Sequence, residues 1–279
     1  MRTIRRNFGR LIFTAVGLSL LGAGPAPVHS APAAPTTYLT FDGNSAVVEV
    51  PSSHNFSIGS AGLTVAVWMR PDSLTFSKTD GSLPSQQYVH WLGKGVSGDE
   101  EWTFRMYSLT RPGPRQNRIS FYVFKASGGR GCGSYFQDPI KAGEWMQVVG
   151  VIDRAAATVS IYKDGLLRHT DSYASLDPAP QPGSAPLRIA SKELTSYLHG
   201  AIGPIMIWDR PLAGSDIRSL FAMHTAPANG LVAHFAMNEG AGATIRDSVG
   251  GLEGTIKGAR WASDAAPIGN SIGTSGGGC

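Results

Sequence analysis

The sequence predicts an all-β protein: an antiparallel β-sandwich with one short helix near residues 215–223. Short runs of β-branched and aromatic residues recur from Tyr38 onward, separated by Gly, Pro, Asn and Asp, as in strands joined by turns. Apolar residues at helical spacing are rare, and we expect a helix at Ser215–Met223 alone. The predicted strands are Tyr38–Phe41, Ala46–Val50, Leu63–Arg70, Tyr88–Lys94, Trp102–Tyr107, Arg118–Phe124, Trp145–Asp153, Thr158–Lys163, Leu187–Ala190 and Ala201–Asp209.

The strand at Leu63–Met69 is apolar on both faces. Side chains alternate between the two faces of a strand, so Val65 and Val67 share one face while Ala66 and Trp68 share the other. A strand of this kind is predicted to lie inside a sheet that is covered on each side.

A β-hairpin is predicted at Asp164-Gly165. The pair lies between the strand-like runs Thr158–Lys163 and Leu166-Leu167. A two-residue hairpin turn needs positive φ angles, and Asp-Gly adopts them at low cost.

Residues 1–30 have the features of a secretory signal peptide. A basic start is followed by the apolar run Leu11–Gly24, and we predict cleavage after Ser30. The run is shorter than the roughly 20 apolar residues of a membrane-spanning helix, which argues against a permanent membrane anchor. We therefore expect a secreted, extracellular or cell-surface protein from a bacterial-type cell.

The export route has two interpretations. Arg5-Arg6 followed by Phe8 resembles a twin-arginine motif, although Gly9 and Arg10 depart from that motif. An ordinary Sec signal is the alternative, and both routes lead out of the cytoplasm.

The net charge of +4 comes from the predicted signal peptide. Residues 1–30 hold four of the 24 Lys and Arg residues and none of the 20 acidic residues, so the remainder is formally neutral. Nucleic-acid binding needs a basic patch to neutralise phosphates, and no Lys/Arg run supplies one. Nucleic acid is therefore not an expected partner.

Cys132 and Cys279 are too few for a disulfide framework or a cysteine-based zinc site. Cys279 lies at the end of a Ser-Gly-Gly-Gly tail that could reach Cys132. A disulfide between them and a free or intermolecular thiol are both compatible with the sequence.

Five motifs resemble, in order, those of a known family. They are YLTFDGNSAVVEVP at Tyr38–Pro51, LTVAVWMRP at Leu63–Pro71, WLGKG at Trp91–Gly95, EWMQVVGVID at Glu144–Asp153 followed by VSIYKDG, and LHGAIGPIMIWDRPLAGSDIRSLF at Leu198–Phe221. Together they resemble the laminin-G-like family of the concanavalin A-like lectin/glucanase superfamily. The resemblance implies a concanavalin A-like jelly roll.

The resemblance divides the chain into segments. Residues 31–37 are a predicted linker, 38–262 the sandwich and 263–279 a flexible tail. Residues 230–261 resemble the segment that normally opens such a domain, and we interpret them as a permuted pair of strands that completes the same sandwich. The start of a truncated second domain is the alternative, but about 32 residues bury too little surface to fold alone.

The sequence lacks the catalytic motif of the superfamily's glucanases. Those enzymes resemble the two-carboxylate scheme, which needs a Glu-x-Asp-x-x-Glu-like run on one strand. None of the seven glutamates (Glu49, Glu100, Glu101, Glu144, Glu193, Glu239 and Glu253) is followed two residues later by aspartate. No Gly-x-Ser-x-Gly elbow and no zinc-binding histidine spacing is present either.

Jelly-roll polysaccharide lyases provide an enzymatic alternative. Gln87 with His90, and the segment Lys141–Gln147, faintly resemble two of their active-site strands. Their order and spacing match poorly.

Calcium is a candidate cofactor. Sites in related folds lie in loops beside the first and last strands, and Asp42 and Asn44 occupy such a loop. Gly203, however, stands where many relatives carry an acidic residue. Asp42 capping a tight Asp-Gly turn is the alternative interpretation.

A candidate ligand-binding strip lies on the strand Trp102–Tyr107. Alternation places Arg105 and Tyr107 on the face opposite Trp102, and aromatic and planar polar groups suit a sugar ring and its hydroxyls. Tyr122 on the next strand, and Arg130 and Tyr135 in a predicted loop, extend the strip, whereas Trp68, Trp145 and Trp208 are predicted core residues.

The expected function is a non-catalytic binding module for an extracellular glycan or other cell-surface ligand, acting through the concave sheet face or the loop rim. This expectation comes mainly from the fold. A polysaccharide lyase or hydrolase and a structural adhesion domain are the alternatives.

Overall fold

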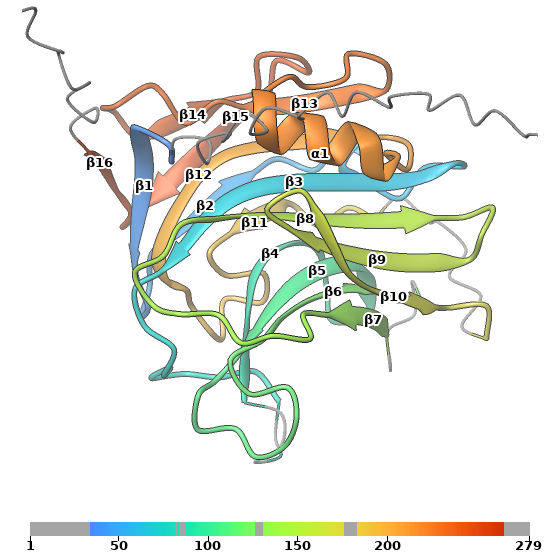
Figure 1. The fold of residues 1–279 in the computed structure, drawn as a ribbon. Helices are drawn as coiled ribbons and strands as arrows, with labels where there is room; N and C mark the ends of the chain where they lie inside the picture. Colours follow the sequence, from blue (N-terminus) through green and yellow to red (C-terminus); the bar gives the residue numbers. More distant parts are fainter. Residues whose placement is uncertain (1–33, 82, 84–86, 126–130, 176–182, 265–279) are drawn as a thin grey trace, which may run out of the picture. The chain divides into compact units, whose positions relative to one another are not determined.

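The computed structural model describes residues 34–81, 83, 87–125, 131–175 and 183–264, which lie within one compact unit. Sixteen strands in these ranges form two antiparallel sheets of eight strands each (Figure 1). The fold is therefore the predicted β-sandwich.

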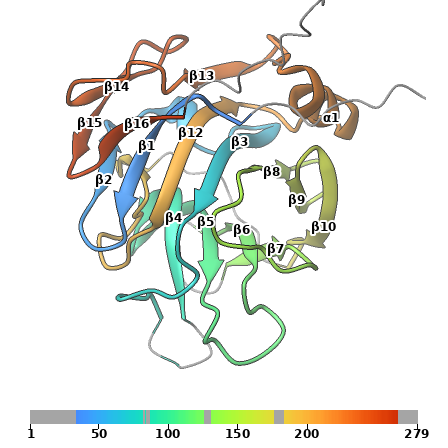
Figure 2. The same ribbon diagram turned by 60° about the vertical axis from the view of Figure 1, so that its left-hand side comes forward.

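Sheet A has the strand order β10-β9-β8-β3-β12-β1-β16, and β13 also pairs with β12. Figure 2 shows β1, β12 and β3 side by side. The strands of sheet A are β1 (Thr37–Asp42), β3 (Gly62–Pro71), β8 (Met146–Asp153), β9 (Thr158–Lys163), β10 (Leu166–Ser172), β12 (His199–Trp208), β13 (Leu231–Phe235) and β16 (Arg260–Ser263).

Sheet B has the strand order β14-β15-β2-β11-β4-β5-β6-β7. Its strands are β2 (Val47–Val50), β4 (Tyr88–Val96), β5 (Asp99–Tyr107), β6 (Ile119–Val123), β7 (Cys132–Tyr135), β11 (Leu187–Ile189), β14 (Thr244–Arg246) and β15 (Glu253–Lys257). A 3-10 turn, η1 (His54–Phe56), and the helix α1 (Gly214–Met223) complete the elements of the described ranges.

The main core lies between the two sheets. Val65 and Val67 of β3 pack in one cluster with Trp102, Phe104 and other apolar residues of sheet B. The Trp102 indole is fully buried and donates a hydrogen bond to the Phe56 carbonyl at 2.7 Å, so its one polar atom is satisfied. Burial of each such side chain contributes roughly 1.5–3 kcal/mol.

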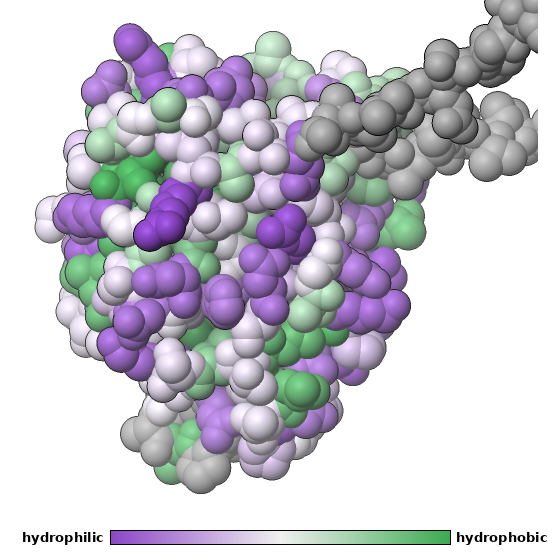
Figure 3. Space-filling view, turned by 90° about the vertical axis from the view of Figure 1, so that its left-hand side faces the viewer, coloured by the Kyte–Doolittle hydropathy of each residue, from purple (hydrophilic) through white to green (hydrophobic). Residues whose placement is uncertain are grey.

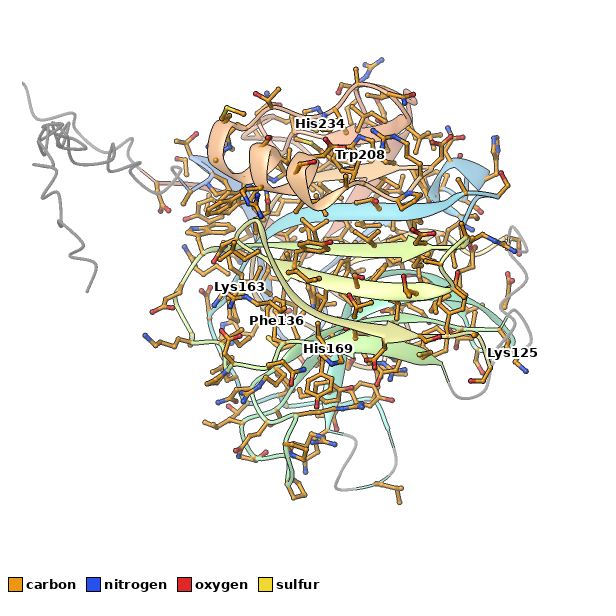
Figure 4. The ribbon with its side chains drawn as sticks, turned by 45° about the vertical axis from the view of Figure 1, so that its right-hand side comes forward. Lys125, Phe136, Lys163, His169, Trp208 and His234 are labelled. Atoms are coloured by element: carbon orange, nitrogen blue, oxygen red, sulfur yellow. The ribbon has the colours of Figure 1, made fainter. Side chains whose placement is uncertain are left out.

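Helix α1 covers the outer face of sheet A. Its Ile217 and Leu220 pack with Ala66, Val149 and Trp208, and Figure 4 shows Trp208 close to the helix. The two-sided apolar pattern of β3 is thus confirmed. The prediction that Trp145 is a core residue is wrong, because this residue precedes β8 and is only partly buried, packing edge-on against Tyr38.

The Asp164-Gly165 hairpin joins β9 to β10 as predicted. Both residues have positive φ, 52° and 74°, as a two-residue hairpin turn requires. The segment Arg130–Tyr135, in contrast, is not all loop: Cys132–Tyr135 forms β7 at the edge of sheet B. Its sequence CGSY lacks the apolar alternation by which strands are recognised.

Residues 230–261 form four strands or parts of strands rather than a pair. β13 and β16 pair with β12 and β1 of sheet A, while β15 pairs with β2 of sheet B and carries β14. The segment therefore contributes to both sheets. The ordered strands also extend one residue beyond the expected domain limits at each end, from Thr37 to Ser263.

Sheet edges β7 and β10 lie beside each other. Ser134 Oγ is 3.0 Å from His169 Nδ1, and Figure 4 shows His169 next to β7. The Cys132 thiol is partly buried here, 3.3 Å from the Ser172 carbonyl oxygen, and burial raises its pKa. The predicted signal peptide, Arg130 and Cys279 lie outside the described residues.

No helix in the described ranges has the length and apolarity needed to cross a bilayer. Figure 3 shows the side of the molecule that bears β1 and β16, where hydrophilic residues surround small hydrophobic areas. The coloured residues of that view form no broad apolar patch, which argues against an apolar docking surface there.

Candidate ligand-binding site

Four neighbouring strands of sheet B place polar and aromatic side chains on the face turned away from sheet A. Trp102 and Phe104 of β5 belong to the core between the sheets, so Arg105 and Tyr107 project on the opposite face. The register pairs Arg105 with Ser120 of β6, and Ser120 with Tyr135 of β7. We call the side chains of Tyr88, Arg105, Tyr107, Tyr122 and Tyr135, with the covering Arg115, the Arg105 strip.

Arg105 is surrounded by aromatic rings. Its guanidinium carbon lies 4.1 Å from the ring centre of Tyr122, 4.6 Å from that of Tyr88 and 5.2 Å from that of Phe124. A cation over an aromatic face contributes about 0.5–2 kcal/mol, depending on desolvation. These contacts hold the guanidinium in place while it remains partly exposed.

Arg115 covers the other end of the strip from the loop between β5 and β6. Its Nη1 donates a 2.6 Å hydrogen bond to the Tyr122 hydroxyl, and its guanidinium lies 4.7 Å from the ring centre of Tyr135. The Tyr122 and Tyr107 hydroxyls are 3.3 Å apart. Burial raises the pKa of Tyr122, so its hydroxyl is neutral at physiological pH.

A buried chain of polar side chains orients Arg105 from below. Arg105 Nε donates to His90 Nε2 at 2.8 Å, so this imidazole nitrogen is an acceptor and carries no proton. The proton is then on His90 Nδ1, which lies 2.8 Å from Asp80 Oδ2. Ser196 Oγ donates to the same carboxylate oxygen at 2.6 Å, and Thr195 Oγ1 donates to the other at 2.5 Å.

The pKa shifts agree with this arrangement. Burial lowers the pKa of His90 to about 4, against the opposing effect of Asp80. Burial alone would raise the pKa of Asp80, but contacts with His90, Ser196 and Thr195 hold it at about 2. His90 is therefore neutral and Asp80 ionised at neutral pH.

The Asp42 loop is a tight turn. Asp42 Oδ1 accepts backbone N–H groups of Asn44, Ser45 and Ala46 at 2.9–3.0 Å, and Ser45 Oγ donates to Oδ2 at 3.1 Å. Burial would raise the pKa of Asp42, but these hydrogen bonds hold it at about 2. The carboxylate thus acts as a turn cap.

A polar pocket of about 410 Å³ lies beside this turn, at the loop rim. It is lined by Asp42, Gly43, Thr75, Phe76, Ser77, Tyr197 and His199. No group of three or more His, Cys, Asp or Glu side chains with metal-binding geometry occurs in the described ranges. Calcium sites also use carbonyl oxygens, so calcium at Asp42 and Asn44 stays a prediction.

Comparison with known proteins identifies the family. The laminin G profile of the concanavalin A-like lectin/glucanases superfamily matches residues 42–218. The chain belongs to this laminin-G-like family. The resemblance drawn from the five motifs is confirmed.

Solved structures show the same laminin-G-like fold. A candidate carbohydrate-binding protein of Bacteroides ovatus aligns with a TM-score of 0.58 and 16% identity over 85% of this chain, which spans 62% of that protein. A heptameric SAP-like pentraxin of Limulus polyphemus aligns with a TM-score of 0.53 and 13% identity over 79% of this chain and 95% of its own length. No curated protein matches the sequence.

The two segments that resemble lyase strands do not meet in this laminin-G-like domain. His90 lies on sheet B, whereas Gln147 lies on β8 of sheet A, with its backbone N–H bonded to Asp164. Gln87 accepts a hydrogen bond from Thr110 at 2.9 Å. They form no common site.

The structure brings together four of the five predicted binding residues. Arg105, Tyr107, Tyr122 and Tyr135 are linked directly or through Arg115. Tyr107 and Tyr122 are only 3% and 7% exposed, so a ligand would mainly contact the more exposed Arg105, Arg115 and Tyr135.

Sequence reasoning missed Tyr88 and Arg115 and did not assign His90 to the strip. Tyr88 and His90 lie two residues apart on a predicted strand and therefore share one of its faces. Knowledge that β4 pairs with β5 would have placed them beside Tyr107 and Arg105. Arg115 lies in a loop, where no periodic pattern predicts the direction in which a side chain points.

Proposed function

We propose that this protein is an exported, non-catalytic module that binds a carbohydrate through the Arg105 strip. The observation that carries the proposal is the guanidinium of Arg105, held 4.1 Å from the ring of Tyr122 and oriented by His90. A binding site of this kind is organised before the ligand arrives, which lowers the entropic cost of binding.

The chemistry of the strip suits a sugar. Tyr135 and Tyr88 are half-buried, so parts of their rings remain available for the apolar face of a pyranose. The guanidinium groups supply several planar donors for hydroxyl oxygens. Such a mixture of aromatic surface and a few fixed polar groups is typical of ligand sites.

Binding is favoured over cleavage by the state of His90. One of its ring nitrogens accepts from Arg105 and the other faces Asp80, so neither is directed to a substrate proton. General base catalysis requires a free acceptor within hydrogen-bond reach of that proton. The similarity to a candidate carbohydrate-binding protein supports the same reading at the level of the fold.

The rim pocket beside Tyr197 is the competing location for a ligand. It also combines aromatic and polar groups, Phe76 and Tyr197 with Asp42 and His199. We favour the Arg105 strip because its side chains are oriented by each other, whereas His199 is exposed.

Export is part of the proposal, and the signal-peptide features of residues 1–30 support it. Expression of the full chain in a bacterial host should yield a protein outside the cytoplasm that lacks these residues. N-terminal sequencing of the exported protein checks the cleavage after Ser30.

A glycan array with the purified protein tests the proposed function. We expect binding to a limited set of glycans without release of reducing ends or unsaturated sugars. Tyr135→Ala should weaken that binding about tenfold, while Tyr197→Ala should leave it unchanged. The reverse result would place the ligand at the rim, and cleavage of a polysaccharide would favour the enzymatic alternative.

A further inference from the structure

We infer that the ligand of the Arg105 strip is a polysaccharide that carries carboxylates, that is, a polymer containing uronic acids. This inference rests on the proposed function and specifies the class of carbohydrate. It depends on two guanidinium groups, those of Arg105 and Arg115.

Neither guanidinium has an acidic partner in the described ranges. Ion pairs there join carboxylates to Arg70, Arg168, Arg188 and Arg246, but none involves Arg105 or Arg115. Arg105 uses Nε for His90, and its two terminal nitrogens have no hydrogen-bond partner among the described residues. A partly buried charge without a counter-ion favours an anionic ligand.

The nearest acidic side chains are engaged elsewhere. Asp80 lies behind His90 and accepts hydrogen bonds from Thr195 and Ser196. Glu100 accepts a 2.7 Å hydrogen bond from Lys192. Neither carboxylate forms an ion pair with Arg105, and Glu100 acts on it only by a longer-range Coulombic interaction.

The loop that supplies Arg115 adds positive charge. Residues 108–118 have the sequence SLTRPGPRQNR, with three arginines and no acidic residue. Arg115 and Arg118 of this loop form no ion pair with a described residue, so both add positive charge at one end of sheet B, although residues 31–279 are formally neutral. Such a local field attracts an anion to this end of the strip.

A carboxylate fits better than a sulfate ester. A guanidinium fork matches a planar carboxylate with two parallel hydrogen bonds, and the terminal nitrogens of Arg105 form such a fork. Polysulfated chains, in contrast, are bound by a dense array of cations, which the two guanidinium groups of the Arg105 strip do not provide. Aromatic rings beside the forks would meet the sugar ring that bears the carboxylate.

Polygalacturonate and its fully methyl-esterified form are a matched pair of probes, because esterification removes the charge and keeps the sugar. We expect the protein to bind polygalacturonate at least tenfold more tightly than the ester in titration calorimetry or affinity gels. Arg105→Gln and Arg115→Gln should each weaken binding of polygalacturonate by about tenfold to a hundredfold. Arg260→Gln, an exposed arginine at the edge of sheet A, is the control and should bind like the original protein.

Thermal melts accompany each variant. Arg105→Gln removes ring contacts as well as charge. If this variant does not fold, Arg115→Gln and Arg105→Lys still test the inference. Arg105→Lys keeps the charge but not the fork, and we expect it to bind polygalacturonate as weakly as Arg105→Gln.

The outcomes separate the inference from the proposed function. Binding of neutral glycans alone, or tighter binding of dextran sulfate than of polygalacturonate and alginate, would overturn the uronic-acid inference and leave carbohydrate binding intact. Absence of binding to every glycan would overturn both. Equal binding of polygalacturonate and its ester would also contradict the inference.

Discussion

The ring of Tyr122 lies across Gly133 of the neighbouring strand β7, with Arg105 on its other side. A Cβ atom at position 133 would be 2.3 Å from Tyr122 Cδ2, and the Arg105 guanidinium carbon is 4.1 Å from the centre of the ring. The ring can occupy this position only because residue 133 has no side chain. Gly133 therefore leaves room for the Tyr122 ring, and this ring in turn packs against the Arg105 guanidinium.

Replacing Gly133 with alanine should displace this stack. We expect Gly133→Ala to weaken glycan binding at least tenfold and to cost about 1–3 kcal/mol of unfolding free energy through overpacking. Calorimetric titration and chemical denaturation measure the two effects. Gly214→Ala is the control, since its Cβ would come no closer than 3.8 Å to another residue. Unchanged affinity in a folded Gly133→Ala protein would show that the position of Tyr122 does not matter for binding.

The buried His90 makes stability depend on pH. Its pKa is about 4 in the folded protein and about 6.5 in an unfolded chain. Between these values the unfolded chain binds a proton that the folded chain does not, so stability falls as the pH falls from about 6.5 to 4.

His90→Gln removes this titration. We expect the stability advantage of the original protein over this variant to shrink by about 2–4 kcal/mol between pH 7 and pH 4. Denaturation curves at half-unit pH steps provide the measurement, and His199→Gln in the exposed rim serves as control. A constant difference over that range would mean that His90 is not held neutral by the fold.

The sequence predicted the strands and the face of Arg105 because both depend on local alternation. Apolar residues at every second position identify β3, β5 and β8. The same alternation places Arg105 and Phe104 on opposite faces of β5. Partners across the sheet depend on register between strands, which a single sequence does not give. The contacts from His90 and Arg115 to the strip were therefore not predictable.

The closing segment illustrates the same limit. Residues 230–261 were predicted as a pair of strands, yet β13 and β16 join sheet A while β14 and β15 join sheet B. Gly-rich turns separate four short strands of three to five residues, too short to show a clear period. The division between the sheets arises from tertiary pairing with β12, β1 and β2.

The contact of helix α1 with sheet A should stabilise the fold without affecting the ligand site. Leu220 is 2% exposed in the cluster that contains Trp208. Leu220→Ala should reduce the free energy of unfolding by about 2–4 kcal/mol through the cavity it leaves. The dissociation constant for the glycan should stay within twofold, because the Arg105 strip lies on the other sheet. A large loss of affinity in the folded variant would contradict this separation.

Asp42 provides the test for calcium. In chelator, Asp42→Asn should lower the free energy of unfolding by about 1 kcal/mol, because the capped turn loses its charge-assisted hydrogen bonds. A calcium ion bound only by the folded state would raise the melting temperature as well. Melts in calcium and in chelator, for both proteins, separate the roles: a calcium-dependent rise that Asp42→Asn abolishes would establish the metal, and its absence would leave Asp42 as a turn cap.

Hydrogen exchange of the protein saturated with its bound glycan, compared with the free protein, tests the binding surface most directly. Ligand on the Arg105 strip should slow exchange most strongly in residues 108–118 and in β5, β6 and β7. Protection confined to residues 72–78 and 197–199 would place the ligand in the rim pocket and contradict the account.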